Sequence, residues 1–265
     1  MKVSILITYY NRKKLLKKTL DSIIKSEYIN DTEILIVDDA SKDKHRIEEL
    51  ISKYHKYNIT LFRFEKKDKW WTLQIPAHNK LISMATGDII IQQGAECYHS
   101  GDIIKDAINN IKDNMYRVYG CYALNKENTK DLYFSTKNDY ILEKKNNIGF
   151  SFEKGGWYQH SVLNNRCLNF CTAITKKDLL ELGGFDERFS NGLAFGDNEF
   201  ILRIVRKKMN IVSIDDLYVY HQFHKPMKSN KKNELLENKN SNLYFNKVVY
   251  ESTIKVHNSF LNSTE

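Results

Sequence analysis

Near the start of the chain, two short hydrophobic runs flank an amphipathic stretch. Residues 3–7 and 33–37 are mostly apolar, which predicts two buried strands. Between them, after Asn11 as the expected N-cap, apolar residues recur at helical spacing, which predicts a helix. A strand, a helix and a strand at this spacing form a βαβ unit, so we expect the two strands to be parallel and covered on both faces.

The same alternation continues along the chain and predicts one α/β domain with a mostly parallel central sheet flanked by helices. We expect Gly87 to end one helix, Ser100 to cap the next, and Thr175 to cap a short helix that stops at Gly183 and Gly184. The further strands are expected at 60–64, 88–93, 116–124 and 169–174, and the further helices at 76–84, 103–111 and around 200–205.

Two stretches lack this alternation. Residues 125–165 are polar, rich in Asn and Lys and without a clear period, which predicts long surface loops of the kind that act as lids or binding loops. Beyond His224 the chain becomes basic and polar, and we expect a peripheral helix or a partly ordered tail at 226–265.

The polar residues that follow the predicted strands are the candidates for chemistry. In an open parallel sheet, ligands bind beyond the carboxyl ends of the strands. The segments expected there are 8–12, 38–41 and 93–99. The first of them has no glycine-rich phosphate loop, which disfavours a dinucleotide-binding or P-loop protein. The acidic pair Asp38 and Asp39 suits the hydroxyls of a ribose, although either carboxylate can simply cap the next turn.

These segments resemble the opening motifs of the family 2 glycosyltransferases. Residues 3–12, with Thr-Tyr-Tyr-Asn-Arg after a strand, and 37–41, with Asp-Asp-Ala-Ser, match the first two motifs. Residues 77–79 and 85–88 are similar to the next block, in which Arg commonly stands at the place of His78. The resemblance covers about 1–110 and, more loosely, 165–224. It implies a GT-A (Rossmann-like) fold over 1–225, with a nucleotide-sugar-binding half at 1–124 and an acceptor-side half at 125–225.

The resemblance also implies a donor site. Thr8 and Asp39 would contact the uracil and ribose of a nucleotide sugar, most simply a UDP-sugar, with Asp38 close by. The other residues that it places around the donor are Tyr10, Arg12, His78, Asn79, Gly94 and Ala95.

A divalent cation is implied next to this donor. The family carries an Asp-x-Asp motif, whereas the corresponding residues here are Gly94, Ala95 and Glu96, without the first Asp. Residues 96–102 resemble a subset of the family with Glu-Cys-x-His-x-Gly-Asp at this place. By that resemblance Glu96 and His221 would bind Mn²⁺ or Mg²⁺, with His224 as the fallback to His221. The alternative is that Glu96 and His99 cap the next helix.

The second half carries the expected base. Residues 183–189 and 195–203 resemble the acceptor-side block of the family, in which a Gly-Gly-Phe-Asp turn leads to an acidic cluster opening a helix. An inverting transfer needs one carboxylate to take the proton from the acceptor hydroxyl. By position that base is Asp197, with Glu199 in reserve. Without the resemblance, both would be acidic residues placed at the favourable end of a helix dipole.

Aromatic and amide residues nearby are candidates for the acceptor, which would be a glycan, a glycolipid or a glycoprotein. Trp157, Asn169 and Phe170 are named for this role, although a large aromatic residue in a loop more often pins the loop to the body. Two rival functions stay open. The incomplete metal motif allows a non-catalytic nucleotide-sugar-binding relative. A sugar-1-phosphate nucleotidyltransferase is disfavoured, because it should carry a basic, glycine-rich first loop.

Charge and cysteine content narrow the partners and the compartment. The formal net charge is +8, but the lysines are spread along the chain, so we expect no nucleic-acid partner. A positive surface suits anionic sugar nucleotides, and acceptors on anionic lipid would bring peripheral membrane association.

The 4 cysteines have no paired spacing, which predicts free thiols in a reducing compartment. We see no signal-peptide core and no apolar run of about 18 residues, so the sequence predicts a soluble, cytoplasmic protein. The oligomeric state is not predicted.

Overall fold

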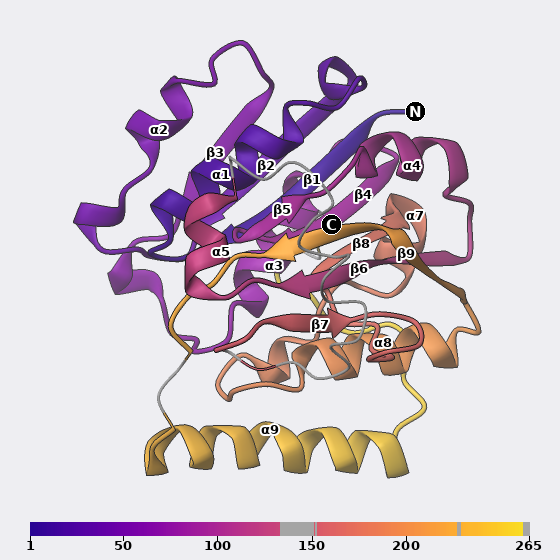
Figure 1. Ribbon diagram of the computed structural model, residues 1–265. Coiled ribbons are helices and arrows are strands. Elements are labelled where there is room, and N and C mark those ends of the chain that lie inside the picture. The colour runs from indigo at the N-terminus through magenta and orange to yellow at the C-terminus, as the bar shows by residue number, and fades with distance from the viewer. Residues whose placement is uncertain (133–150, 152, 227–228, 262–265) are drawn as a thin grey trace.

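The computed structural model describes residues 1–132, 151, 153–226 and 229–261. The described strands form one sheet in the order β3-β2-β1-β4-β8-β6-β9-β5, with β7 paired to β6 (Figure 1). The strands are β1 Val3–Tyr9, β2 Thr32–Asp38, β3 Ile59–Arg63, β4 Ile89–Gly94, β5 Cys97–His99, β6 Met115–Ala123, β7 Gly156–Gln159, β8 Cys171–Thr175 and β9 Asn210–His221.

The first four strands form the expected parallel unit. β1 pairs in parallel with β2 and with β4, and β2 pairs in parallel with β3. Every residue of β1 and β2 is buried, because helices cover both faces of this part of the sheet. The α/β class and the βαβ start predicted from the hydrophobic pattern are therefore confirmed.

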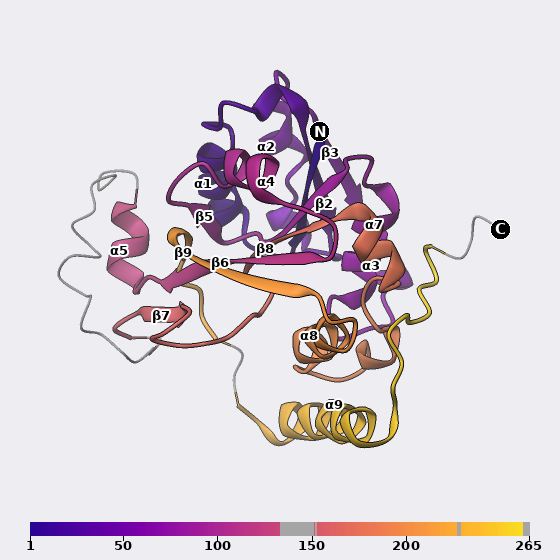
Figure 2. The same cartoon turned by 90° about the vertical axis from the view of Figure 1, so that its right-hand side faces the viewer.

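Helices pack on both faces of the sheet, and the sheet separates the core into two hydrophobic clusters (Figures 1 and 2). Leu16, Leu50 and Ile103, from α1, α2 and α4, belong to the hydrophobic cluster on one face. Leu81 and Phe200, from α3 and α8, belong to the cluster on the other face. The described helices are α1 Lys13–Ile23, α2 Glu48–Ser52, α3 Ile75–Met84, α4 Ile103–Asn110, α5 Lys126–Asp131, α7 Lys176–Glu181, α8 Gly196–Arg206 and α9 Lys231–Tyr250.

Two of the predicted helix caps are wrong. Arg12, not Asn11, stands at the N-cap of α1, and its side chain makes no capping hydrogen bond. Asn11 instead has a left-handed backbone, with φ 56°, and its side chain accepts a hydrogen bond from the backbone NH of Lys42. Asp102, not Ser100, caps α4 by accepting from a backbone NH of its first turn.

Of the helix ends predicted at Gly87, Thr175, Gly183 and Gly184, the first is wrong and the others are confirmed. Helix α3 already ends at Met84, and Gly87 is needed for a different reason: a Cβ atom there would lie 2.7 Å from the backbone nitrogen of Ser4. Thr175 caps α7 as predicted. Gly183 and Gly184 follow that helix with φ of 75° and 73°, a conformation that favours glycine, so the predicted stop is confirmed.

The stretches without periodicity contain more regular structure than expected. Helix α5 and strand β7 lie within 125–165, so the expectation of loops throughout is wrong there, while 133–150 and 152 fall outside the described residues. Of the two alternatives at the C-terminus, the peripheral helix is correct. Helix α9 lies beside α8, on the side away from the sheet (Figure 2). The domain boundary placed at 225 stays a prediction.

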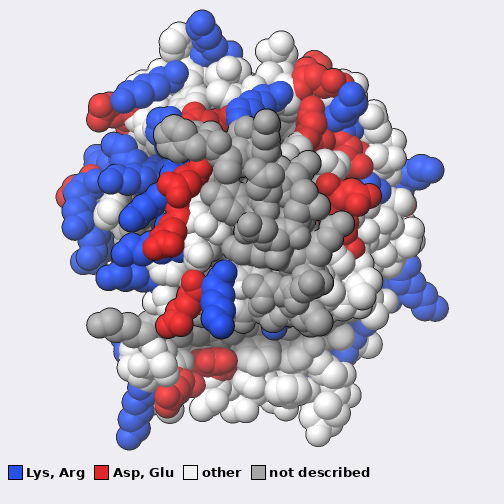
Figure 3. All heavy atoms as spheres, in the orientation of Figure 1, with Lys and Arg blue, Asp and Glu red and all other residues white. Residues whose placement is uncertain are grey.

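The surface charge and the state of the cysteines were both addressed in the sequence analysis. On the face shown in Figure 3, basic side chains occur in several groups, with acidic side chains among them. The cysteines are free thiols, and burial raises the pKa of Cys97, Cys121 and Cys171. Within the described part of the chain, no helix combines the length and apolarity needed to span a bilayer.

Candidate active site

One edge of the sheet gathers residues from distant parts of the chain. β1 and β4 end side by side there, with Thr8 paired to Gly94. Because β8 runs antiparallel to β4, its amino end lies at the same edge, and the NH of Gly94 donates to the carbonyl of Phe170 at 3.4 Å. β9 ends there as well, with His221 opposite Cys97 of β5. The strand directions thus bring the predicted donor and metal residues together.

Glu96, His221 and His224 form a compact cluster at this edge. One ligand atom from each lies within 4.8 Å of the other two. The Nε2 atoms of both histidines are 3.5 Å from Oε1 of Glu96. Arg12 completes the cluster, with its Nη1 donating to the same oxygen at 2.5 Å. The expected pair of Glu96 and His221 is therefore adjacent, and His224 stands beside it rather than in its place.

The cluster keeps Glu96 ionised. The carboxylate is 8% exposed, and burial alone would raise its pKa. Hydrogen bonds from His221 and His224 and the charge of Arg12 outweigh burial and hold the pKa well below its usual value. An ionised carboxylate beside two imidazoles is a donor set for a divalent first-row metal, and it suits Mn²⁺ better than Mg²⁺, which prefers oxygen ligands and water.

The acidic pair after β2 is already hydrogen-bonded. Asp38 accepts from the NH of Ser41 at 2.8 Å and from Arg63 at 2.6 Å, so the turn-capping alternative describes it well. Asp39, 1% exposed, accepts from Lys69 at 2.6 Å and from the indole NH of Trp71 at 2.7 Å. Burial raises the pKa of Asp39, and these two donors partly offset that shift.

The other expected donor residues surround this edge. Tyr10 is 41% exposed, and the ammonium of Lys69 lies 4.9 Å from its ring centre. Ala95 is buried, and its carbonyl accepts from the hydroxyl of Thr19 at 2.9 Å. Gly94 keeps space beside the cluster, since a Cβ atom there would approach Cδ of Glu96 to 3.3 Å. Lys69, which binds Asp39, was not named from the sequence as a donor-site residue.

Asp197 lines a cavity of about 330 Å³ at the start of α8. It accepts a hydrogen bond from the amide of Asn169 at 3.4 Å. Burial raises the pKa of Asp197, and Asn169 offsets part of the rise. His78 lines the same cavity, 4.8 Å from the ring of Phe185, and burial lowers its pKa to about 4, so its ring is neutral at pH 7.

Two consecutive residues join this cavity to the metal cluster. Asn169 contacts Asp197, while the ring of Phe170 lies 5.7 Å from the ring of His221. Neighbouring Cα atoms are about 3.8 Å apart, so the two candidate groups flank the same short segment. Tyr158 adds an aromatic ring 4.5 Å from Phe170 and 5.6 Å from His221.

Two expected site residues serve the fold instead. Glu199, the reserve base, is 0% exposed, and its carboxylate binds Arg203 at 2.6 and 2.8 Å and Lys247 at 2.6 Å, which excludes it from contact with an acceptor. Asn79 is also 0% exposed, and it accepts from the NH of Phe185 and donates to the carbonyl of the same residue. Asn79 therefore pins the Gly-Gly-Phe-Asp turn, and a direct contact with the donor is wrong for this geometry.

Trp157 offers no open ring face for an acceptor. It is 5% exposed and packs edge-on against Tyr122 and Tyr218, with ring centres at 5.2 and 5.5 Å. The structure thus favours the alternative in which this aromatic residue anchors its segment to the body. Of the three residues named for the acceptor, Asn169 and Phe170 are the two that lie at the candidate site.

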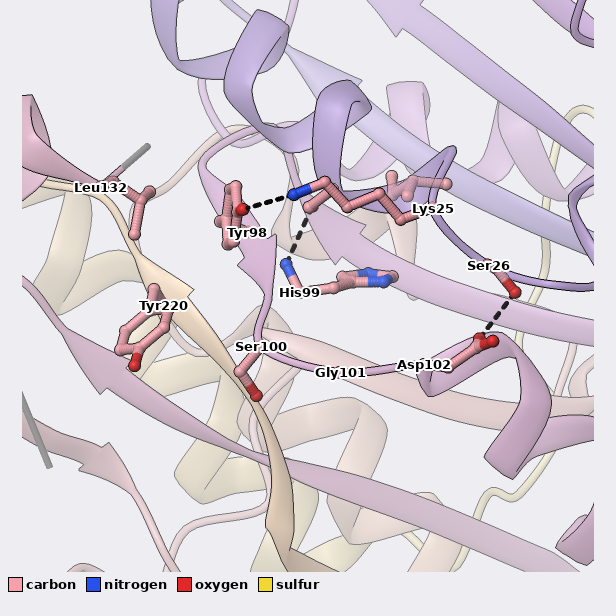
Figure 4. A pocket seen from close by; sticks show the side chains of 11 residues that line it. Lys25, Ser26, Tyr98, His99, Ser100, Gly101, Asp102, Leu132 and Tyr220 are labelled. Carbon is pink, nitrogen blue, oxygen red and sulfur yellow. Dashed lines mark hydrogen bonds between the residues drawn. The ribbon is translucent and has the colours of Figure 1, made fainter. Parts of the chain in front are cut away.

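A second cavity, of about 290 Å³, lies between the end of α1 and β5 (Figure 4). Its polar groups already bind one another: Ser26 donates to Asp102 at 2.6 Å, and Lys25 donates to the hydroxyl of Tyr98 at 3.2 Å. His99 also lines it, but its ring bonds Gln93 at 2.6 Å, so the expectation that His99 caps the next helix is wrong. None of the residues predicted for donor, metal, base or acceptor lines this cavity.

Comparison with solved structures supports the fold. The Pyrobaculum calidifontis mannosyltransferase PcManGT, in complex with GDP-Man and Mn²⁺, shares 19% identity at TM-score 0.55 over 84% of this chain and 57% of its own. S. aureus TarS 1-349, in complex with UDP, shares 16% at TM-score 0.58 over 83% and 60%. GalNAc-T7, with UDP, GalNAc and Mn²⁺, shares 17% at TM-score 0.58 over 83% and 44%. The chain therefore spans less than two thirds of each of these proteins.

The family comparison is decisive for classification. A search of curated protein sequences finds no significant match. The family model described as Glycosyl transferase family 2, however, matches residues 4–170, well over half of the chain. That range includes β1 with Thr8, the acidic pair after β2, and Glu96, and the GT-A fold expected from them agrees with the solved structures. The chain belongs to glycosyl transferase family 2.

Proposed function

We propose that the protein transfers a sugar from a nucleotide diphosphate sugar, UDP-linked by preference, to an acceptor hydroxyl with inversion at the anomeric carbon. The observation that carries this proposal is the cluster of Glu96, His221 and His224 at the sheet edge where Thr8 and Asp39 also lie. Proteins of similar fold support it, because GalNAc-T7 was solved with UDP, GalNAc and Mn²⁺ and PcManGT with GDP-Man and Mn²⁺.

Glu96, His221 and His224 would hold the cation, which is Mn²⁺ by the argument from donor type. When bound, the cation offsets the negative charge that develops on the departing diphosphate. Arg12 lies next to the same carboxylate and supplies a second positive charge to this rim. Both charges suit an anionic leaving group.

The nucleoside end of the donor would lie at the ends of β1 and β2. Lys69 and Trp71 hold the carboxylate of Asp39 in one orientation, and a carboxylate can accept further hydrogen bonds, here from a ribose hydroxyl or a uracil NH. The half-exposed ring of Tyr10 is available to cover the base.

Asp197 would act as the base. As the acceptor oxygen forms its bond to the anomeric carbon and the bond to the diphosphate breaks, the hydroxyl proton passes to the carboxylate of Asp197. The raised pKa of Asp197 makes it a stronger base than an exposed aspartate. His78 is neutral at pH 7 in the same cavity, so it adds no positive charge that would lower the pKa of Asp197.

The proposal is tested by incubating the protein with UDP- and GDP-sugars and Mn²⁺ and measuring release of the nucleoside diphosphate. We expect UDP release that requires Mn²⁺. In Asp197→Asn, transfer should fall by about 10²–10⁴-fold, because the base is lost, while Mn²⁺-dependent UDP binding is retained. Asp113→Asn, at an aspartate that is 60% exposed and paired with Lys177, is the matched control and should behave as wild type.

Two results would contradict the proposal. If the protein binds UDP yet releases none from any donor, it is a binding protein and not a transferase. If Asp197→Asn turns over at the wild-type rate, the base lies elsewhere.

A further inference from the structure

Helix α9, which lies outside the segment matched by the family model, contacts the backbone that leads to Asp197. Asn240, on the inward face of α9, is 0% exposed. Its side-chain NH₂ group donates to the carbonyl of Ala194 at 2.9 Å and to the carbonyl of Phe189 at 3.0 Å. One buried amide therefore ties together both ends of the turn that precedes α8.

The backbone conformation of that turn is unfavourable without support from neighbouring groups. Ala194 and Phe195 have φ of 58° and 60°, the left-handed region that is unfavourable for residues with a Cβ atom. Such a conformation persists only when neighbouring groups impose it. α9 supplies these groups: besides Asn240, the ring of Tyr244 lies 5.5 Å from the ring of Phe195.

The fit between α9 and the turn is close. A Cβ atom on Gly192 would lie 2.0 Å from Oδ1 of Asn240, so Asn240 occupies space that only glycine leaves. The NH of Leu193 also donates to the carbonyl of Leu236, at 3.0 Å. Helix α9 thus contacts each residue of the segment from Gly192 to Phe195, by a hydrogen bond or by packing.

Part of the segment from Gly192 to Phe195 lines the candidate catalytic cavity. Ala194, Phe195 and Asp197 all line that cavity, and the NH of Glu199 donates to the carbonyl of Phe195 in the first turn of α8. A change in the backbone at Ala194 therefore displaces the carboxylate of Asp197, two residues after Phe195.

We propose that Asn240 is a positioning residue for the transfer reaction, acting through the carbonyl of Ala194 to place the carboxylate of Asp197. This inference rests on the proposed function, in which Asp197 is the base. Other contacts keep α9 docked when Asn240 is changed, since Lys247 binds Asp186 at 2.8 Å and Arg206 donates to the carbonyl of Lys247 at 3.0 Å. The effect of losing the amide is then local to the turn.

The test compares Asn240→Ala and Asn240→Asp with wild type. The aspartate keeps the shape of asparagine but replaces the donor with an oxygen that faces two carbonyl oxygens. Asn238→Ala, at an exposed asparagine of the same helix, is the control. The measurements are kcat, KM for the UDP-sugar, Mn²⁺ affinity from the electron paramagnetic resonance signal of free Mn²⁺, and the unfolding temperature.

We expect kcat to fall by about 10- to 100-fold in both Asn240 variants, the size of effect that small misplacements of catalytic groups produce. KM for the donor and Mn²⁺ affinity should stay within about twofold, because the donor edge lies elsewhere, and Asn238→Ala should match wild type. Folded Asn240 variants with wild-type kcat would overturn the inference, and so would a uniform loss of kcat, donor affinity and Mn²⁺ affinity.

Two further variants keep the outcome decisive. If neither Asn240 variant folds, Tyr244→Leu removes the ring contact with Phe195 and is judged by the same split between kcat and KM. Asp197→Asn separates the two proposals. Loss of transfer in Asp197→Asn together with normal kcat in the Asn240 variants refutes the positioning role alone, whereas normal transfer in Asp197→Asn refutes the base.

Discussion

At the scale of single residues, three side chains converge on the Oε1 atom of Glu96. Arg12 donates to it at 2.5 Å, and Nε2 of His221 and Nε2 of His224 each lie 3.5 Å away. Under the proposed function, a divalent cation bound through this oxygen would compete with the guanidinium of Arg12. Arg12, once displaced, would be free to contact the donor diphosphate.

We predict that Arg12→Ala binds Mn²⁺ about tenfold more tightly than wild type in the absence of nucleotide, since a charge-assisted hydrogen bond of ~1.5–3 kcal/mol no longer has to be broken. Titration of free Mn²⁺ by electron paramagnetic resonance measures this. Glu96→Ala should lose the binding, and Lys14→Ala, at an exposed lysine of α1, should leave it unchanged. Weaker Mn²⁺ binding in Arg12→Ala would show that the two cations do not compete.

Part of this site could be predicted from sequence because strand ends have fixed places in a parallel sheet. The strand pattern placed Glu96 just after β4, at the edge where ligands bind, whereas His221 at the end of β9 was placed beside it only by the resemblance to the family. The roles of Glu199 and Asn79 could not be read in this way. Both look like site residues from their motifs, but their partners, Lys247 and the backbone of Phe185, are fixed by tertiary packing that carries no local signal.

At the scale of elements, strands were more predictable than helix ends. β1 and β2 are buried along their whole length, so their hydrophobic runs stand out from the surrounding sequence. A cap depends on one side chain: the better residue type, Asn11, lost to Arg12, and Ser100 lost to Asp102, an equally suitable type. α5 and β7 were missed because α5 is polar and β7 is short, leaving neither with a clear period.

The docking of α9 depends on an internal charge that its sequence does not reveal. Lys247 is 0% exposed and binds Asp186 at 2.8 Å and Glu199 at 2.6 Å. Removing Lys247 would take one of two cationic partners from each of these buried carboxylates, which keep Arg188 and Arg203. The helix is thereby joined to the turn that follows α7 and to α8.

Lys247→Ala should accordingly lower the free energy of unfolding by about 3–5 kcal/mol, measured by urea denaturation. Lys239→Ala, at an exposed lysine of the same helix, should change it by less than about 0.5 kcal/mol. Equal stabilities for the two variants would mean that Lys247 contributes little to holding α9.

At the scale of the whole molecule, the partly buried His78 and the buried His99 contribute to the response to acid. Burial lowers the pKa of both His78 and His99 to about 4, from 6.5. The unfolded chain takes up these protons first, so stability should fall as pH drops from about 6.5 to 4. Asp186 acts in a lower window: Arg188 and Lys247 outweigh its burial and hold its pKa at about 2, so its stabilisation is lost below pH 4.

The measurement is the unfolding free energy from urea curves at pH 7, 6, 5 and 4. We expect wild type to lose stability across this range and His99→Gln to lose less, because it removes one of the two protons taken up. A variant whose stability falls as steeply as that of wild type would show that His99 takes up its proton equally in the folded and unfolded chain.

The pair Asn169 and Phe170 has a consequence for how such an enzyme can diversify. Asn169 contacts the group that would remove the proton, and Phe170 contacts one that would hold the cation, so a single planar peptide links the contacts of both groups. A cavity side chain from another segment, such as Leu73, lies outside that unit. Under the proposed function, a change at such a position would alter the choice of acceptor while the link between the base and the cation site is kept.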